Sequence, residues 1–519
     1  MKIILHLLIA SLIMASCGST NTTTQNTTSD PTVYGNTITS QDLKDMLYIY
    51  ASDDFEGRET GEPGQKKAVN YLKDQYVKMG IPSPLKADDY FQEVPLEKQK
   101  YPEVTMAVNG SKMKNYEDYL ILGPVDSQDL NINDIIYAGY GIDADNYSDY
   151  KDIDVKGKIV LIKAGEPKDA NGHYITSGTT AATKWSAGRA SISSKRDAAK
   201  QNGAKAVIFV DNTLMSQYGN YYQRVAALGT AARISLKSNT PKMTFIMANE
   251  HMAKAIYPEI MDSNASKALI TNITCAITSK SEAVASENVV AFLEGREKPE
   301  EILVISAHLD HEGVKDGKVY NGADDDGSGT VAILEIAQAF KSAADNGDGP
   351  KRSILFLHVT GEEKGLLGSK HYTDNDPIFP LKNTVADLNI DMIGRTDPKR
   401  DGDRNYVYLI GSDKLSTDLH DISETANERY ANVILDYTYN DKDDPNRFYY
   451  RSDHYNFAKN NIPVIFYFNG THEDYHKPGD TPDKIQYDLL ENRTRLVFYT
   501  AWELANREDR IRVDKAVTN

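Results

Sequence analysis

Histidine and carboxylate side chains follow four short runs of this 519-residue sequence, each at the point where a run ends. Residues 302–306, 354–359, 385–390 and 463–468 all have the length and apolar character of buried strands. In chain order, the side chains that follow them are His308, Asp310, His311 and Asp324 to Asp326, then Glu362 and Glu363, then Asp391, and last His472, Asp474, Tyr475 and His476. The sequence therefore predicts that four strand ends bring these groups to one rim.

These residue types suit a hydrolytic centre with two metal ions. Zinc accepts imidazole nitrogen and carboxylate oxygen, and a catalytic zinc site keeps one position open for water. Two neighbouring ions acidify a shared water and hold the attacking and leaving oxygens. Such a centre needs a bridging carboxylate, a carboxylate and a histidine for each metal, and one free carboxylate as base. The adjacent Glu362 and Glu363 can supply one ligand and one base.

The elements that must position these groups alternate between strands and helices from residue 288 onward. A helix with one apolar face is expected over 330–340, between the first two strands. This order predicts an α/β fold with a mixed, mostly parallel central sheet flanked by helices, whose site lies beyond the carboxyl ends of the strands. Nearer the N-terminus, Ser40 is the expected N-cap of a helix, and a second helix is expected over 64–79.

Composition excludes several classes of protein. The net charge of −17 argues against a nucleic-acid partner, which normally meets a basic surface. Cys17 and Cys275 are the only cysteines, so neither a disulfide scaffold nor a cysteine metal finger is possible. Cys275 is expected to be a small buried side chain. The one long apolar run, residues 3–15, is too short to span a membrane.

The first residues are typical of an export signal. Lys2 precedes the apolar run, and small residues stand just before Cys17, so residues 1–16 are predicted to be a signal peptide. Met14-Ala15-Ser16-Cys17 resembles a bacterial lipobox, which implies lipidation of Cys17 and a membrane anchor without a spanning helix. We expect an exported bacterial lipoprotein facing the periplasm or the cell exterior, with a flexible tether over residues 17–37.

Taken together, the motifs resemble the di-zinc aminopeptidases of metallopeptidase family 28, which are related to glutamate carboxypeptidase and the transferrin receptor. The resemblance rests on residues 52–61 (SDDFEGRETG), 306–311 (SAHLDH), 322–329 (GADDDGSG), 361–369 (GEEKGLLGS), 389–394 (NIDMIG) and 474–476 (DYH). Residues 121–282 resemble an inserted protease-associated (PA) domain, β-rich in its pattern. The peptidase domain would then comprise residues 38–120 and 283–519.

The resemblance implies a role for each matching residue. His308 and Asp391 would bind one Zn²⁺, Glu363 and His476 the other, and Asp325 would bridge the two. Glu362 would be the general base toward a water bridged between two Zn²⁺ per chain, and Tyr475 would stabilise the oxyanion. The implied activity is removal of N-terminal residues from peptides.

Further residues are expected to support the site. Asp310 would orient the His308 imidazole, Asp326 would follow a cis peptide bond after Asp325, and Asp453 would lie behind the site or line the pocket. His311 is expected beside the site. Spacing alone leaves either His472 or His476 as ligand, and the Tyr-His-Lys-Pro context favours His476.

Three alternatives to the aminopeptidase stay open from the sequence. A carboxypeptidase of the same fold needs a cation for the substrate's terminal carboxylate, and a glutaminyl cyclase typically works with one zinc. A catalytically inactive surface-binding relative would have lost ligands, whereas all five are present here. The sequence sets neither the oligomeric state nor the side-chain preference.

Overall fold

The strands that precede the candidate residues are neighbours at the centre of one sheet. The computed structural model describes residues 30–86, 89–227, 232–238 and 243–515. Its larger sheet has nine strands in the order β10-β1-β13-β17-β14-β18-β21-β19-β20. The central strands β17 (Arg352–Val359), β14 (Lys298–His308), β18 (Thr384–Ile390) and β21 (Val464–Phe468) are parallel, so their carboxyl ends meet at one edge. The predicted mixed α/β fold is confirmed, although the parallel pairing is concentrated in this centre.

Helices cover both faces of this sheet because alternate strand residues point to opposite sides. Leu303 and Ile305 of β14 belong to a core that includes Phe340 of α7 (Gly329–Asp345) and Trp502 of α11 (Tyr487–Asn506). Ile302 and Val304 pack on the other face with Tyr372 and Phe457, the latter from α10 (His454–Ala458). Burial on both faces fixes the strand ends that carry the candidate side chains.

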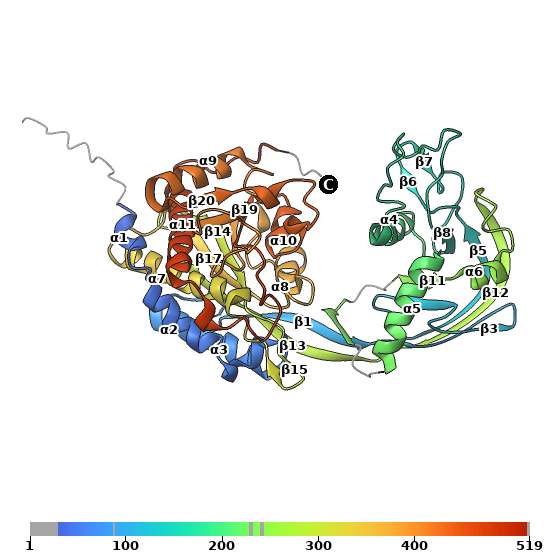
Figure 1. Ribbon diagram of the computed structural model, residues 1–519, viewed down its shortest axis with the longest axis horizontal. Helices are drawn as coiled ribbons and strands as arrows, with labels where there is room; N and C mark the ends of the chain where they lie inside the picture. The colour runs from blue at the N-terminus through green and yellow to red at the C-terminus, as the bar shows by residue number, and fades with distance from the viewer. Residues whose placement is uncertain (1–29, 87–88, 228–231, 239–242, 516–519) are drawn as a thin grey trace, which may run out of the picture.

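The remaining elements of this body surround that centre (Figure 1). They are α1 (Thr32–Gly35), α2 (Ser40–Tyr50), η1 (Asp53–Arg58), α3 (Pro63–Met79), β1 (Phe91–Lys100), β13 (Ser281–Leu293), β15 (Val314–Lys315), β16 (Lys318–Val319), η2 (Ala323–Ser328), α8 (Leu367–Lys370), η3 (His371–Asn375), η4 (Leu381–Asn383), β19 (Tyr406–Ile410), α9 (Thr417–Ala426), η5 (Asn427–Ala431), β20 (Ile434–Asp436), η6 (Thr438–Asn440), η7 (Phe448–Tyr450) and η8 (Pro482–Lys484).

A second sheet of eight strands forms the inserted body, in the order β3-β2-β12-β5-β8-β9-β11-β4. Its elements are β2 (Glu103–Val108), β3 (Ser111–Met113), β4 (Tyr119–Leu122), β5 (Gln128–Tyr137), β6 (Asp143–Ala144), β7 (Tyr147–Ser148), β8 (Ile159–Lys163), α4 (Gly188–Gln201), β9 (Ala206–Val210), α5 (Asn212–Ala227), β11 (Thr244–Ala248), α6 (Glu250–Ile256) and β12 (Lys267–Thr278). Cys275 is buried in β12, as expected.

Two long strands connect the bodies. β1 and β13 pair antiparallel (Figure 1). β10 (Ala232–Leu236) pairs with the other edge of β1. The insertion therefore begins earlier than the expected residue 121, because β2 and β3 already pair within the second sheet, β2 against β12. The sequence alone does not show which partner a strand pairs with, so the boundary expected at residue 121 is wrong.

The N-terminal segment differs from expectation in two details. The expected tether over 17–37 is wrong for residues 30–37, because α1 brings Tyr34 into the core, where its ring stacks on Trp502 at 5.7 Å. The N-cap of α2 is Thr39 rather than Ser40, since the Thr39 side chain accepts a hydrogen bond from the Asp42 N–H. The predicted signal peptide and Cys17 lie outside the described residues. No helix in the described part of the chain is both long and apolar enough to cross a membrane.

Candidate metal centre

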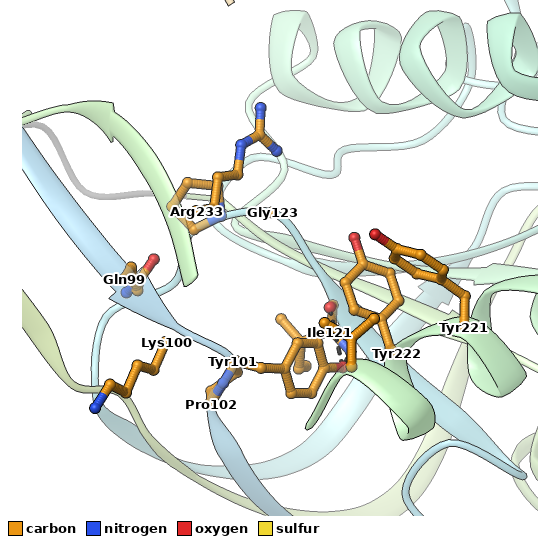
Figure 2. A pocket seen from close by; sticks show the side chains of 11 residues that line it. Gln99, Lys100, Tyr101, Pro102, Ile121, Gly123, Tyr221, Tyr222 and Arg233 are labelled. Carbon is orange, nitrogen blue, oxygen red and sulfur yellow. Dashed lines mark hydrogen bonds between the residues drawn. The ribbon is translucent and has the colours of Figure 1, made fainter. Parts of the chain in front are cut away.

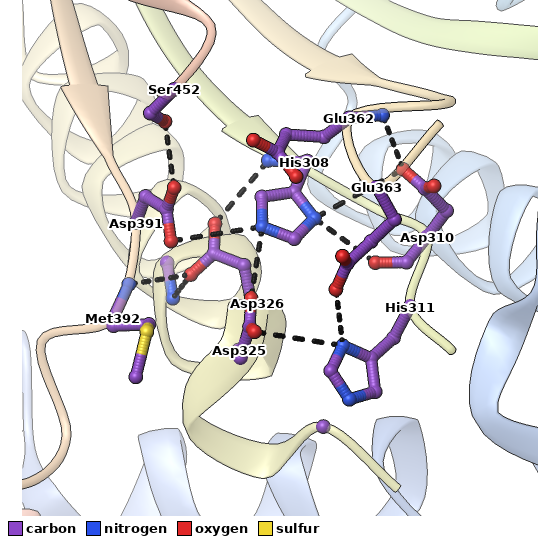
Figure 3. A network of polar contacts seen from close by, with 12 residues as sticks. His308, Asp310, His311, Asp325, Asp326, Glu362, Glu363, Asp391, Met392 and Ser452 are labelled. Carbon is purple, nitrogen blue, oxygen red and sulfur yellow. Dashed lines mark hydrogen bonds and ion pairs between the residues drawn. The ribbon is translucent and has the colours of Figure 1, made fainter. Parts of the chain in front are cut away.

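Among the described residues, an open cavity and a cluster of ligand-type side chains are both candidates for a site. The first is a cavity of about 190 Å³ where β1 and β10 meet α5 of the inserted body, lined by the rings of Tyr101, Tyr221 and Tyr222 and by Arg233 (Figure 2). None of the candidate residues lines it, and its walls offer no carboxylate or imidazole. The second place is the rim at the carboxyl ends of the central strands, where ligand-type side chains converge (Figure 3).

The first group of ligand atoms gathers around His308 at the end of β14. Its Nε2 lies 3.1 Å from Asp325 Oδ1 and 3.6 Å from Asp391 Oδ1. Asp325 belongs to η2, and Asp391 directly follows β18. Three segments that are distant in the sequence thus deliver these groups to one place. These three side chains form one group that could hold a metal ion.

The second group lies on the other side of the Asp325 carboxylate. His476 Nε2 lies 3.1 Å from Asp325 Oδ2 and 3.3 Å from Glu363 Oε2. His311 Nδ1 lies 2.9 Å from Glu363 Oε1 and 3.8 Å from Asp325 Oδ2. Asp325 therefore offers one oxygen to each group, which is the arrangement that a bridging carboxylate requires.

Several buried ligand atoms here have no hydrogen-bond partner among the described residues. They include His308 Nε2, both ring nitrogens of His311, Asp325 Oδ2 and Glu363 Oε1. An unsatisfied buried polar atom costs about 1–3 kcal/mol, so several together in one place call for a ligand. Imidazole nitrogens mixed with carboxylate oxygens are a donor set that zinc prefers, and the residues therefore fit such an ion.

Electrostatics favour a cation at the same place. Burial raises the pKa of Glu363 to about 8, with the Asp325 carboxylate adding to the shift. Burial raises the pKa of Glu362 well above its ordinary range, and Glu363 and Asp391 raise it further. The pKa of Asp325 is lowered well below its ordinary value despite its burial, because the His308, His311 and His476 rings outweigh the burial. Crowded carboxylates of this kind are stabilised in their charged form by nearby positive charge.

The Asp326 side chain forms hydrogen bonds with three segments around the ligand residues. The Asp325-Asp326 peptide bond is cis, as the family resemblance implied. Asp326 Oδ2 accepts a hydrogen bond from the His308 N–H at 3.2 Å, and Oδ1 accepts from the N–H groups of Gly329 and Met392 at 2.9 and 3.1 Å. One buried side chain therefore joins the end of β14, the start of α7 and the loop after β18.

Asp310 contacts the His308 ring differently from expectation. His308 Nδ1 lies 3.0 Å from the backbone oxygen of Asp310 and 4.0 Å from its carboxylate, so the carbonyl rather than the carboxylate meets the ring. Asp391 Oδ2 accepts a hydrogen bond from the Ser452 hydroxyl at 2.6 Å. Asp453 accepts one from Ser369 and lies behind the site rather than in it. Burial raises the Asp453 pKa to about 7.

Glu362 and Tyr475 border a pocket beside the two groups. Its other lining residues are Asp325, Asp391, Met392, Phe448, Arg451, Phe466, Phe468 and His476. Glu362 belongs to neither ligand group, so its carboxylate is available for another task. The Tyr475 ring stacks on His476 with centroids 3.9 Å apart, and its hydroxyl lies 3.4 Å from Arg451. Burial and the nearby carboxylates hold the Tyr475 pKa above its ordinary value, which keeps the hydroxyl protonated.

His472, the alternative ligand, is placed away from both groups. Its Nε2 lies 3.2 Å from Asp324 Oδ2, in the loop beneath the site. The Asp480 carboxylate is close to the same loop. It accepts hydrogen bonds from the backbone N–H groups of Asp324 and Asp325 at 3.0–3.1 Å. The geometry therefore favours His476 over His472 as the side chain that faces Asp325 and Glu363.

Arg58 is a supporting residue that sequence reasoning did not single out. Its buried guanidinium donates to the backbone oxygens of Leu309, Asn321 and Gly322 at 3.1, 2.6 and 2.9 Å. These oxygens belong to the two loops that carry His308 and Asp325, so Arg58 braces both. The residue lies in the resembling loop 52–61, and its match to that motif was the available signal.

The sequence matches two family models. Residues 288–501 match peptidase family M28, and residues 130–238 match the PA domain. The chain is therefore similar to M28 peptidases over much of the body with the nine-stranded sheet, and to PA domains over part of the inserted body. The M28 match contains every residue of the ligand groups described above, from His308 to His476. The PA match falls within the inserted body.

Known proteins similar to this chain include aminopeptidases. Aminopeptidase YwaD of Bacillus subtilis is 28% identical over 230 residues, which are 43% of this chain and 46% of that protein. A probable leucine aminopeptidase of Arthroderma otae is 32% identical over 220 residues, which are 40% of this chain and 55% of the relative. The chain thus spans about half the length of these curated relatives.

A solved structure shares the architecture across almost the whole chain. The aminopeptidase from Aneurinibacillus sp. strain AM-1 matches 94% of this chain and 98% of its own, with a TM-score of 0.50 and 19% sequence identity. At 19% sequence identity, this structural similarity establishes the fold of the chain alone. This chain therefore has the same fold as that solved structure.

Proposed function

We propose that this M28 protein is a metal-dependent aminopeptidase that removes N-terminal residues from peptides. One observation carries the proposal: unpartnered ligand atoms of His308, Asp325 and Glu363 converge beside a pocket that also contains the uncommitted carboxylate of Glu362. This is the combination of ligands and free base that peptide hydrolysis requires. The named activities of YwaD and of the Arthroderma relative support the same reaction class.

Two zinc ions fit the two ligand groups. His308 and Asp391 would hold one, Glu363 and His476 the other, and Asp325 would contact both. Bound there, the metal would polarise the peptide carbonyl and acidify water. The one oxygen that Asp325 offers to each side supports two ions rather than one, and a glutaminyl cyclase with a single zinc fits this set less well.

The chain's own residues would perform the proton transfers and the orientation. Glu362 would take a proton from water and deliver it to the leaving amine. The Tyr475 hydroxyl would donate a hydrogen bond to the oxygen that becomes negative as the carbonyl is attacked. The carboxylates around the pocket would attract the free ammonium of a peptide N-terminus.

A panel of aminoacyl-p-nitroanilides tests the proposal, with the N-acetylated form of each compound as the matched control. An aminopeptidase cleaves the free compounds and leaves the acetylated ones intact, because acetylation removes the ammonium charge. Equal cleavage of both forms, or of neither, would contradict the proposal. The zinc-loaded full chain and the chelator-treated chain are compared in parallel.

A carboxypeptidase is a second candidate because one cation lines the pocket. Arg451 is the guanidinium among the lining residues, and a guanidinium is suited to a substrate carboxylate. N-blocked dipeptides with free and amidated C-termini test this alternative. Cleavage that requires both a free C-terminus and Arg451 would replace aminopeptidase by carboxypeptidase activity.

We also propose that the protein is an exported bacterial lipoprotein anchored through Cys17. The sequence up to residue 17 supports this, and peptide substrates outside the cytoplasm would suit an anchored exopeptidase. Incorporation of radiolabelled palmitate into the wild-type chain and its loss in Cys17→Ala are the expected results. Labelling of both forms, or of neither, would refute lipidation at this cysteine.

A further inference from the structure

His311 is a fully buried imidazole that the ligand set implied by the family resemblance leaves unused. It lies three residues beyond His308, in the loop after β14. Figure 3 shows its ring pointing toward Glu363 and Asp325. The distances from its Nδ1 are 2.9 Å to Glu363 Oε1 and 3.8 Å to Asp325 Oδ2. It therefore contacts the group that also includes His476.

The close approach of His311 to Glu363 is not a hydrogen bond. Neither His311 ring nitrogen has a hydrogen-bond partner in the described part of the chain, and Glu363 Oε1 has none either. His311 Nδ1 and Glu363 Oε1 are both buried and lie 2.9 Å apart without hydrogen-bond geometry. Each therefore needs a partner, and a third atom in contact with both would supply it. A cation between them satisfies both lone pairs, and a carboxylate and an imidazole are the two donor types that zinc combines.

Other buried histidines show that burial alone does not produce this arrangement. His358 Nε2 lies 2.8 Å from the Tyr76 hydroxyl, and no carboxylate is within ion-pair distance of its ring among the described residues. His454 is buried against the Phe466 ring at 4.8 Å and likewise has no carboxylate at that range. The carboxylate neighbours, rather than the lack of solvent, distinguish His311.

We propose that His311 Nδ1 is a ligand of the metal ion held by Glu363, Asp325 and His476. This ion then has two imidazole ligands, whereas the ion at His308 and Asp391 has one. The additional nitrogen shifts the preference of this position from hard cations such as Mg²⁺ toward zinc. The inference rests on the proposed metal-dependent function and adds a specific ligand to it.

Two substitutions separate a direct ligand from a side chain that only orients Glu363. His311→Ala removes the imidazole, and His311→Asn keeps an amide nitrogen near the position of Nδ1. A direct ligand predicts that both variants lose more than about 100-fold in affinity for one of two zinc ions, since loss of an outer partner alone costs about 10–100-fold. His358→Asn is the control for removal of a buried imidazole.

Zinc affinity is measured by chelator competition and zinc content by elemental analysis, both on the full chain. X-ray absorption of the wild-type zinc form should show three imidazoles shared by two ions rather than two. Wild-type affinity in His311→Asn, or equal zinc loss in His358→Asn, would overturn the assignment of His311. Absence of zinc binding by the wild-type chain would instead refute the proposed function, so the two failures are distinguishable.

Discussion

The carboxylate of Asp310 connects the N-terminal loop to Glu362. Asp310 Oδ1 accepts a hydrogen bond from the Glu362 N–H at 3.1 Å, and Oδ2 accepts one from the Thr60 hydroxyl at 2.7 Å. Thr60 lies 250 residues earlier in the chain and is buried. The loop after η1 thereby helps to fix the backbone position of the proposed base.

Replacing Thr60 by valine is expected to weaken this connection with little change in shape. The buried Asp310 carboxylate would lose one donor, which costs about 1–3 kcal/mol. A less firmly held Glu362 should also lower kcat by roughly 10-fold, in the range of other supporting contacts at metal sites. Urea unfolding and steady-state kinetics measure the two effects. Thr500→Val, whose buried hydroxyl donates to Leu496 O within α11, is the control, and equal effects in both variants would contradict the link.

Glu362→Gln should abolish turnover while zinc content stays unchanged. Glutamine has the same shape but cannot accept the proton, and a general base contributes about 10²–10⁴-fold. Glu362 belongs to neither ligand group, so its loss should not release metal. Glu363→Gln should lose zinc and activity together. A Glu362→Gln variant that keeps activity, or that loses zinc, would remove Glu362 from the proposed role.

His476→Ala should lower zinc content, whereas His472→Ala should not. His476 Nε2 faces Asp325 Oδ2 and Glu363 Oε2, while His472 Nε2 faces Asp324 Oδ2 beneath the site. Elemental analysis of both purified variants, with thermal unfolding as a check on folding, makes the comparison. Zinc loss in a folded His472→Ala variant with normal zinc in His476→Ala would reverse the assignment.

The grouping of the ligand residues could be predicted from the sequence because the rule that governs it is local. Each candidate follows a buried strand, and parallel strands place their carboxyl ends at one edge, so His308, Glu363 and Asp391 had to meet. The choice of His476 over His472 needed only the adjacent Tyr-His-Lys-Pro residues. These features depend on neighbours within a few positions.

Long-range contacts could not be predicted in this way. Arg58 donates to the carbonyls of Leu309 and Gly322, which lie more than two hundred residues away in the chain. No hydrophobic periodicity in the sequence indicates such a contact. The start of the insertion depended on which strand β2 selects as its partner. Polar neighbours in the sequence predict a tether around Tyr34, whereas its ring stacks on Trp502. In each case the deciding partner is distant in the chain.

Glu335, a buried carboxyl on α7 away from the metal groups, should make stability fall as pH rises. Burial raises its pKa to about 8, with Asp42 adding to the shift. The unfolded value is near 4.5, so the native state binds the extra proton between these values, and this contribution is complete below about pH 4.5 and lost as pH rises through 8. Glu335→Gln removes the titration.

The variant should therefore lose less stability than the wild type between pH 5 and 8, by about 1–4 kcal/mol. Urea unfolding at both pH values measures this difference. The measurement uses a Trp185→Phe background, so that the fluorescence comes from Trp502 alone. Trp502 lies in the same core as α7 and therefore follows the unfolding of that core. Glu428→Gln at an exposed position of η5 is the matched control. Parallel pH profiles for Glu335→Gln and the wild type would show that Glu335 does not carry the effect, because a protonated buried carboxyl must make the two profiles diverge.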